Sequence, residues 1–335
     1  MDTKPRLLMA DEYIERLLDA TRNAKKRIFM LFFVMTNDSE TCEVIDEIIA
    51  AAARGVEVHV AIDMLSLYAN KSFRNTKEIT ARLRKNKVRV RLLGMHSNFI
   101  FLDRNHSKWY VADDAVFSFG GINLNDIHLS QHVDYMLHIN DAKLADMFCR
   151  EQLRIESKNK HGNKVRSRSV KTDVGTVIFD GSLYNRSLIY KRAVELSKEA
   201  DEILYVSQYY PTGKLNRVMR GKKVRIYANN PENAMTTDSR FMTGLSRKSS
   251  DQVNSYTRGT YLHAKFMIFA MPDGRKKALL GSHNFFKLTS IVGTREIDLE
   301  TENPHIIKQL EKFFRDNIYS PVISNVAQRS REILK

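Results

Sequence analysis

A pattern of histidine, lysine, glycine and asparagine occurs twice in this chain of 335 residues. The first copy lies in NHSKWYVADDAVFSFGGIN and contains His106, Lys108, Asp113, Gly120 and Asn123. The second copy lies in LHAKFMIFAMPDGRKKALLGSHN and contains His263, Lys265, Gly281, Ser282 and Asn284. One copy in each half of the chain predicts a molecule built from two related halves, whose two copies of the pattern form one site.

The stretches around the histidines and lysines are apolar and alternating, which predicts strands in which positions i and i+2 share one face. His106 and Lys108 are therefore expected to point the same way, as are His263 and Lys265. A lysine ammonium neutralises anionic oxygens, and an imidazole acts as a nucleophile or proton donor near neutral pH. The two pairs therefore predict chemistry on a phosphate group.

Amide and carboxyl side chains follow both pairs. The amides of Asn123 and Asn284 are expected to donate hydrogen bonds to the same phosphate oxygens. Asp134 in HVDYMLHI and Glu296 in TREIDLE lie in apolar strands further on. A carboxylate that accepts from the far ring nitrogen of a histidine fixes its tautomer and stabilises the charged imidazole. Each residue alone would be interpreted as structural, but their matched order in both halves indicates a site.

Helical and strand patterns alternate along the chain. A strand-like run at 27–35 is followed by a helical stripe that ends at Gly55 and by a strand at 56–63. A helix around 76–85 and a strand at 88–93 continue the first half. The second half repeats the order, with a helix around 188–200 and strands at 203–207 and 224–227. This alternation predicts an α/β fold around a central sheet.

A polar, basic stretch at 156–171, ESKNKHGNKVRSRSVK, has no apolar periodicity and separates the halves. We interpret it as an exposed linker rather than a polyanion-binding arm, because runs of charge usually face water. The predicted division is an N-terminal half at 1–157, a basic linker at 158–172 and a C-terminal half at 173–335.

The chain carries 54 Lys and Arg residues against 39 Asp and Glu residues, a net charge of +15. This excess predicts attraction to nucleic acid or to anionic lipid headgroups, and composition does not choose between them. The longest apolar run, 28–35, is far shorter than the roughly 20 residues of a membrane-spanning helix, so we expect no membrane crossing. The first seven residues hold no signal-peptide core, and two isolated cysteines, Cys42 and Cys149, favour a reduced, cytoplasmic setting.

HSKWYVAD followed by GGIN, and LHAK followed by GSHN, resemble the paired HxK(x)4D(x)6GSxN motifs of the phospholipase D superfamily. The surrounding sequence resembles the cardiolipin synthase branch: AAARGVEVHVAID before the first motif, GGINLND after it and YTRGTYLHAK entering the second. The resemblance covers roughly residues 27–300. It implies an α/β fold of two pseudo-symmetric α/β/α sandwich halves with the active site at their interface.

The resemblance also implies a phosphodiester exchange in two steps that needs no metal and no cofactor. One histidine attacks phosphorus to give a phosphohistidine, while the other protonates the departing alkoxide and then activates an alcohol or water. We expect His106 to be the nucleophile and His263 the general acid and base. Asp134 and Glu296 are expected to orient the histidines. The phosphate is expected to be bound by Lys108, Lys265, Asn123, Asn284 and Ser282.

The chain departs from the family pattern in three places. Gly121 replaces the serine of the first GSxN, as in the cardiolipin synthase branch that the chain resembles. Ala270 stands where the second motif would carry its aspartate, and extra residues that fit a PDGR hairpin precede Gly281. That aspartate supports structure in the family, so its loss bears on local packing. The third departure is that the N-terminal membrane-spanning helices of many cardiolipin synthases have no counterpart here.

Several further residues receive weaker interpretations. Trp109 is expected in the core and Tyr110 in the pocket, because they alternate along one strand. A pocket edge is predicted at Thr236, Thr237 and Asp238. No metal is assigned, because no acid or cysteine at metal-ligand spacing accompanies the neighbouring histidines His128, His132 and His138.

Phosphatidyl transfer or phospholipid hydrolysis at a membrane surface is the function that the resemblance favours. A nuclease or phosphodiesterase acting on nucleic acid is the alternative, for which a charge of +15 is equally suitable. Nucleases of the superfamily often carry one motif and dimerise, whereas this chain carries both. A family member that binds phosphate without turnover would require a broken motif, and both motifs retain His, Lys and Asn. We therefore expect an enzyme in the cytoplasm, peripheral at the inner face of the membrane, with anionic phospholipid and no protein as its partner.

Overall fold

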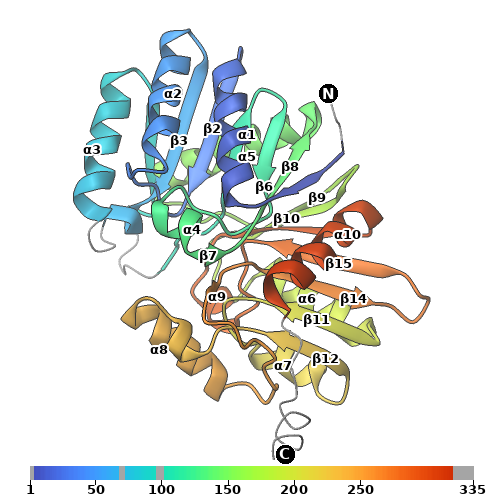
Figure 1. Cartoon of the computed structure of the whole chain (residues 1–335). Coiled ribbons are helices and arrows are strands. Elements are labelled where there is room, and N and C mark those ends of the chain that lie inside the picture. Colours follow the sequence, from blue (N-terminus) through green and yellow to red (C-terminus); the bar gives the residue numbers. More distant parts are fainter. Residues whose placement is uncertain (1–3, 68–71, 96–101, 320–335) are drawn as a thin grey trace, which may run out of the picture.

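Two seven-stranded sheets form the body of the protein, and a two-stranded sheet joins its halves (Figure 1). The computed structural model describes residues 4–67, 72–95 and 102–319, and the helices and strands lie within those ranges. The first sheet has the order β1 (Arg6–Leu8), β8 (Met136–Asn140), β6 (Ala115–Ser118), β5 (Trp109–Ala112), β2 (Arg27–Phe32), β3 (Glu57–Asp63) and β4 (Arg89–Leu93). The second has the order β12 (Lys223–Tyr227), β11 (Glu202–Val206), β14 (Phe266–Ala270), β15 (Lys276–Gly281), β16 (Ile297–Thr301), β10 (Gly175–Phe179) and β9 (Arg168–Thr172). The small sheet pairs β7 (His132–Val133) with β13 (Tyr261–Leu262).

Six strands of each sheet follow one plan. The order β3-β2-β5-β6-β8-β1 of the first sheet matches β12-β11-β14-β15-β16-β10 of the second. The pairs β2–β3 and β11–β12 are parallel, and the pairs β2–β5 and β11–β14 are antiparallel. β4 and β9 extend the two sheets at opposite ends of this plan. The repetition confirms the fold of two pseudo-symmetric halves.

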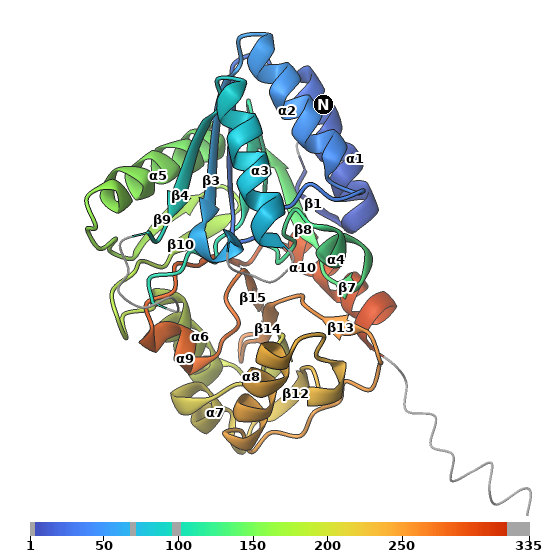
Figure 2. The same cartoon turned by 90° about the vertical axis from the view of Figure 1, so that its left-hand side faces the viewer.

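Helices cover both faces of each sheet (Figure 2). The outer face of the first sheet is covered by α1 (Ala10–Asn23), α2 (Cys42–Ala53) and α3 (Ser72–Lys85), and its inner face by α5 (Ala142–Lys160). The second sheet carries α6 (Leu188–Glu199) and α7 (Gly213–Met219) outside and α10 (Pro304–Phe313) inside. The connections hold α4 (Asp126–Ser130), α8 (Thr237–Lys248), α9 (Lys287–Ile291) and the helical turns Met64–Leu67, Pro231–Asn233 and Phe314–Ile318. In the described part of the chain, no helix combines the length and apolar character that crossing a bilayer requires.

Aromatic residues between the sheets pack the halves together. Trp109 of β5 meets Phe148 of α5 edge to face, with ring centroids 5.4 Å apart, and Phe179 of β10 at 6.4 Å. Each such pair adds roughly 0.5–1.5 kcal/mol beyond the burial of area. Trp109 therefore belongs to the core, as predicted. The prediction for Tyr110 is wrong: alternation turns it to the outer face, where it is buried and its hydroxyl bonds Thr21 of α1.

The segment expected to link the halves contains more regular structure than its polarity suggested. Helix α5 continues to Lys160 and β9 begins at Arg168, so only residues 161–167 lie outside both elements. The polar side chains are used locally: Asn159 accepts a hydrogen bond from the N–H of Gly94 and donates one to the carbonyl of Leu92, and Glu156 pairs with Arg89. The exposed linker is therefore shorter than the predicted 158–172, because a polar surface helix and an edge strand carry little apolar periodicity.

Candidate active site

Each histidine–lysine pair lies in an extended segment immediately before a strand. Lys108 precedes β5, which begins at Trp109, and Lys265 precedes β14, which begins at Phe266. We expected the pairs to lie within strands. That expectation is wrong, because both pairs end one residue before the strand begins. The reason is that both segments leave their own sheet and hydrogen-bond to the backbone of the other half.

These backbone bonds determine which residues meet. The N–H groups of His263 and Ala264 both donate to the carbonyl of Val133, at 3.0 and 2.9 Å. The N–H of His106 donates to the carbonyl of Arg295 at 2.8 Å. Val133 directly precedes Asp134, and Arg295 directly precedes Glu296. These backbone bonds therefore bring each motif histidine beside the predicted carboxylate of the opposite half.

Both histidines are hydrogen-bonded to those carboxylates through Nδ1. The distance from His106 Nδ1 to Glu296 Oε2 is 2.9 Å, and that from His263 Nδ1 to Asp134 Oδ2 is 2.6 Å. A proton held at Nδ1 by a carboxylate leaves the lone pair on Nε2, which is the nitrogen available for bonding to a substrate. The expected role of Asp134 and Glu296 in orienting the histidines is thus consistent with their positions.

A cavity of about 530 Å³ lies between the halves and contains both imidazoles. Its walls include the predicted site residues His106, His263, Asn123, Asn284 and Glu296. Its other lining residues are Phe33, Val34, Arg104, Asn125, Ile127, His128, His132, Gln208, Tyr209, Met235, Thr236, Ser239, Met242, Tyr261, Thr289 and Thr294. The two copies of the motif therefore share one cavity.

The two lysines are fully buried beneath the histidines. Lys108 Nζ donates to the carbonyl of His106 at 2.5 Å, and Lys265 Nζ donates to the carbonyl of His263 and lies 3.1 Å from its Nδ1. Each lysine is therefore bonded to the main chain of the histidine of its own motif, and neither is among the residues that line the cavity. Burial lowers the pKa of Lys108 to about 7 and that of Lys265 to about 8. Both ammonium groups are thus poised to lose a proton near neutral pH.

Burial also lowers the pKa values of both histidines, and that of His263 lies well below its ordinary value. The two carboxylates differ. Burial raises the pKa of Asp134 to about 6, although Lys265 opposes the change. Burial also acts to raise the pKa of Glu296, but His106 and Lys108 together hold it below the ordinary value. Glu296 is therefore the more firmly ionised of the pair.

The amide and serine side chains of the motifs occupy unequal positions. Asn123 Oδ1 accepts from the N–H of Val34 at 3.2 Å, while Asn284 Oδ1 is buried without a hydrogen-bond partner among the described residues. Ser282 Oγ donates to Glu296 Oε2 at 2.5 Å and accepts from the N–H of Ile297. Ser282 therefore supports a carboxylate, and its role in binding substrate stays a prediction.

Glycines permit the close approach of the strands behind the site. A Cβ at Gly120 would lie 1.9 Å from the carbonyl oxygen of Tyr135, and one at Gly281 would lie 2.2 Å from that of Ile297. At Gly121, the position of the replaced serine, a Cβ would lie 2.5 Å from Asp134 Oδ2 and 2.8 Å from His263 Nδ1. The departure from the family motif therefore matches the packing of this half-site.

Other predicted residues fall around the cavity or away from it. Asp113 accepts hydrogen bonds from the N–H groups of Lys25, Lys26 and Arg27, so its role is structural, as expected. Thr236 lines the cavity, whereas Thr237 and Asp238 begin helix α8 beside it. The sequence had shown His128 and His132 next to the first motif, but it gave no sign that both line the cavity, because their place depends on the contact between the halves.

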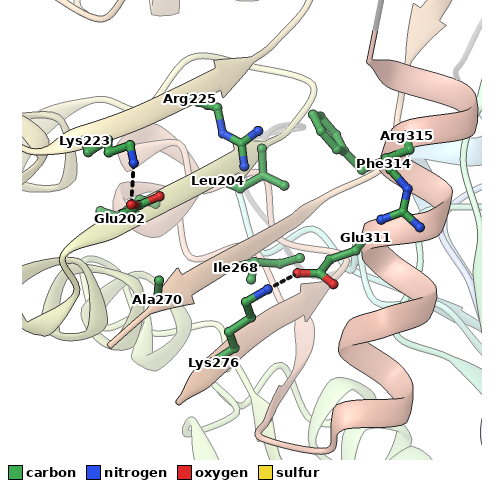
Figure 3. Close-up of a pocket in the computed structure, with 11 residues that line it drawn as sticks. Glu202, Leu204, Lys223, Arg225, Ile268, Ala270, Lys276, Glu311, Phe314 and Arg315 are labelled. Atoms are coloured by element: carbon green, nitrogen blue, oxygen red, sulfur yellow. Dashed lines mark hydrogen bonds and ion pairs between the residues drawn. The ribbon is translucent and has the colours of Figure 1, made fainter. Parts of the chain in front are cut away.

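A second hollow, of about 400 Å³, lies between the second sheet and the end of α10 (Figure 3). Its lysines are paired with acids, Lys223 with Glu202 and Lys276 with Glu311 (Figure 3). Arg225 lies over the ring of Phe314, 5.8 Å from its centroid. None of the histidines, asparagines or lysines that the motif repeats (His106, Lys108, Asn123, His263, Lys265 and Asn284) lines this hollow. We therefore place the candidate active site in the cavity between the halves.

Residues 17–155 match the family model described as "Cardiolipin synthase, PLD-like domain". Two curated relatives are the proteins named cardiolipin synthase B of Salmonella typhimurium (strain LT2) and Salmonella typhi. Each is 26% identical over 147 residues, which cover 41% of this chain and 34% of the relative. The matched part thus spans about a third of the length of these relatives.

Solved structures extend the likeness of fold to nearly the whole chain. The phosphatidylserine synthase of Haemophilus influenzae Rd KW20 is similar with a TM-score of 0.74 and 16% identity, covering 94% of this chain and 86% of that one. A polyphosphate kinase from Porphyromonas gingivalis is similar with a TM-score of 0.61 and 15% identity, covering 94% of this chain and 51% of that one. At such identities the likeness shows the fold alone.

Proposed function

We propose that this chain, in which residues 17–155 match a cardiolipin synthase, PLD-like domain, transfers or hydrolyses the phosphodiester of a phospholipid through a phosphohistidine intermediate. The observation that carries the proposal is the pair of crossed histidine–carboxylate bonds on one cavity, His106 to Glu296 and His263 to Asp134. This arrangement supplies two imidazoles with free Nε2 atoms, which is what a nucleophile and a separate proton donor require.

In the first step, His106 Nε2 attacks phosphorus and the bond from phosphorus to the leaving oxygen breaks. The ring of His106 gains positive charge as the N–P bond forms, and the ionised Glu296 at its Nδ1 stabilises that charge. The leaving alkoxide takes its proton from His263, so an alcohol departs. A neutral His106 suits this role, because burial lowers its pKa in the free site.

His263 must be protonated to act as the acid, and the substrate supplies the condition for it. Burial lowers the pKa of His263, and the nearby charge of Lys265 lowers it further. A phosphodiester anion in the same cavity opposes both effects and raises the pKa of the imidazole. Binding of substrate therefore favours the acid form that the first step uses.

In the second step, His263 removes a proton from water or from an alcohol, whose oxygen attacks phosphorus while the N–P bond to His106 breaks. The same residue thus serves as acid and base in opposite directions. Water gives phosphatidic acid, and the hydroxyl of a second phosphatidylglycerol gives cardiolipin. Lys108, Lys265, Asn123 and Asn284 are proposed to bind the phosphate. Both asparagines line the cavity, and both lysines lie against the main chain of the histidines.

Exposed apolar residues at the cavity favour a lipid over a nucleic acid. Ile127 and Met235 line the cavity and are 45% and 48% exposed. Phe241 and Leu245 of α8, the helix that follows Met235, are 69% and 39% exposed and lie one helical turn apart. The same helix carries the exposed cations Arg240, Arg247 and Lys248. Apolar and basic residues together suit insertion at the surface of an anionic membrane, so we propose that the protein works peripherally at the inner membrane face.

The experiment that tests the function compares two substrates in the presence of EDTA. Purified full-length protein is incubated with phosphatidylglycerol vesicles and, separately, with single-stranded DNA. We expect conversion of the lipid to cardiolipin or phosphatidic acid, and the product identifies the acceptor. Cleavage of DNA without turnover of lipid would assign the protein to the nucleases instead, and activity that EDTA abolishes would contradict the mechanism.

A matched pair of variants tests the membrane surface. Phe241→Ser is expected to weaken binding to anionic vesicles about tenfold, the equivalent of burying part of one large apolar side chain. Hydrolysis of a soluble short-chain phospholipid should be unchanged. Val253→Ser removes an apolar residue that is 84% exposed and lies outside the cavity lining, and it serves as the control. Equal vesicle binding by both variants and the parent would exclude α8 as the docking element.

A further inference from the structure

Three histidines gather at one side of the cavity. His128 lies in α4, His132 begins β7, and His263 belongs to the second motif. One ring nitrogen from each residue can be chosen so that the three atoms lie within 4.8 Å of one another. In sequence only His128 and His132 are neighbours, and the third imidazole comes from the other half of the chain through the pairing of β7 with β13.

The imidazoles of this cluster have few protein partners. The Nδ1 atoms of His128 and His132 are buried and have no hydrogen-bond partner among the described residues. The other ring nitrogen of His128, Nε2, lies 3.3 Å from Asn123 Nδ2. The rings themselves are in contact, with centroids 4.4 Å apart for His128 and His132 and 4.5 Å apart for His128 and His263.

We propose that His128, His132 and His263 form a binding site for a divalent transition metal of the zinc class, at the position of the proposed general acid. Three imidazoles with a fourth position open to the cavity are a donor set that zinc, copper, cobalt and nickel accept. Calcium and magnesium prefer oxygen ligands and are not expected to bind. The second shell is also present, because Asp134 accepts from His263 Nδ1 at 2.6 Å and leaves Nε2 for the metal.

The spacing of the three imidazoles suits this role. In a tetrahedral site with Zn–N bonds of about 2.0–2.1 Å, neighbouring ligand nitrogens lie about 3.3 Å apart. The three ligand nitrogens lie within 4.8 Å of one another, so they must come closer together to bind the ion.

A metal at this position has a consequence for catalysis that, unlike the site itself, rests on the proposed function. The ion occupies the lone pair of His263 that the reaction uses to carry a proton. Turnover therefore stops while the metal is bound and returns when it is removed. The metal acts as a reversible inhibitor of a reaction whose chemistry does not need one.

Cobalt provides a direct test of the site, because its visible absorption reports coordination by the protein. Full-length protein without a histidine tag is treated with EDTA, freed of the chelator and titrated with Co²⁺. We expect one ion per chain with the visible bands of a four-coordinate site. His128→Gln and His132→Gln should each weaken binding at least about tenfold, and Asp134→Asn about tenfold through the second shell. The exposed His305 of α10 gives the control variant His305→Gln, which should bind as the parent does.

The outcomes separate the site from its consequence. One folded variant, His128→Gln or His132→Gln, is sufficient for the test. The proposal would be overturned if that variant bound cobalt as the parent does, or if the parent bound no cobalt. Inhibition is measured apart from binding: micromolar Zn²⁺ should abolish lipid turnover, EDTA should restore it, and Mg²⁺ should have no effect. Binding of cobalt by a protein that turns over no phosphodiester would leave the metal site standing and refute only the proposed function.

Discussion

The two half-sites share one plan but differ in how the carboxylate is held. In one, Glu296 accepts from His106 and from Ser282, and its pKa lies below the ordinary value. In the other, Asp134 accepts from His263 and from the N–H of Gly121, and burial raises its pKa to about 6. The His106 side chain is 16% exposed and that of His263 only 5%. The two half-sites thus have the same residue types, and local packing makes them unequal.

The inequality matches the two tasks that the proposed reaction sets. A nucleophile needs access to phosphorus and a lasting negative charge behind it, which the more exposed His106 and the ionised Glu296 provide. An acid and base must gain and lose a proton in each cycle. His263, whose carboxylate partner is itself close to titration, suits that exchange. The difference between the halves therefore predicts a division of roles that a symmetric site would not have.

Removing either imidazole should produce the largest effect. His106→Ala and His263→Ala are each expected to lower turnover of phospholipid by about 10,000-fold or more, because a nucleophile or its proton donor is lost. The assay is the initial rate on phosphatidylglycerol vesicles, with circular dichroism to show that both variants are folded. A variant of either histidine that retains a tenth of the parent activity would contradict the shared mechanism.

A substrate with a nitrophenyl leaving group separates the two roles, because nitrophenolate departs without a proton from the enzyme. His263→Ala should release about one equivalent of nitrophenolate in a burst and then stall with phosphorus on His106. His106→Ala should show no burst. The opposite pattern would exchange the assignments of nucleophile and acid while leaving the cavity as the active site.

The carboxylates should show the next largest effect and the clearest asymmetry. Glu296→Gln removes a charge that stabilises the phosphorylated ring, and a loss of roughly 100- to 10,000-fold in kcat is expected. Asp134→Asn should cost about tenfold at pH 7. The Asp134 carboxyl, with a pKa of about 6, is charged above that pH and neutral below it. The penalty of Asp134→Asn should therefore shrink at pH 5, whereas that of Glu296→Gln persists, and parallel pH profiles would refute the inequality.

Exchanging the residues behind the carboxylates tests how packing sets this difference. Gly121→Ser places a Cβ 2.5 Å from Asp134 Oδ2 and 2.8 Å from His263 Nδ1, so the pair must move. We expect a loss of about 10- to 100-fold in kcat, since small displacements of catalytic groups are costly, and about 1–3 kcal/mol of stability.

Ser282→Gly is the matched change in the other half. It removes the hydrogen bond to Glu296 and the one accepted from the N–H of Ile297, and it creates no clash. About 1–2 kcal/mol of stability should be lost. Thermal unfolding and kcat of both variants provide the measurement. A Gly121→Ser protein at least as active as Ser282→Gly would show that the first half-site has room for the family serine.

The repeated motif was sufficient to predict the fold, and the cavity between the halves contains both of its histidines and both of its asparagines. His106, Lys108, His263 and Lys265 could be found because strand alternation and pattern repetition act over short stretches of sequence. The two-half architecture followed from one copy of the motif in each half. The predicted linker was too long. Only residues 161–167 lie outside α5 and β9, because the polar end of α5 and the edge strand β9 carry little periodic signal.

The partners of those residues could not be predicted in the same way. Which histidine meets which carboxylate depends on the bonds from His263 and Ala264 to Val133 and from His106 to Arg295, and these cross between the halves. The same contact brings His263 beside His128 and His132. Contacts between the halves leave no local pattern, so the sequence predicted candidate site residues but neither the crossed pairs nor the histidine cluster.

The two lysines offer the finest test of the comparison, through pH. A lysine is charged below its pKa, so phosphate binding should weaken as pH rises past about 7 for Lys108 and about 8 for Lys265. The kcat/KM of the parent, which reports the free enzyme, should fall at least about tenfold between pH 7 and pH 9.

Two lysine variants test the coupling between these groups. After burial, the charge of Lys265 contributes to the lowered pKa of Lys108. Without the charge of Lys265, the pKa of Lys108 should rise. The kcat/KM that remains in Lys265→Met should therefore fall at a pH about half a unit to one unit higher than in the parent. Lys265 has the higher pKa of the two, so Lys108 has already lost its proton where Lys265 titrates, and Lys108→Met should leave the limb of Lys265 in place. Equal displacement in both variants would mean that the lysines titrate as one symmetric pair, and the asymmetry of the half-sites would then end at their carboxylates.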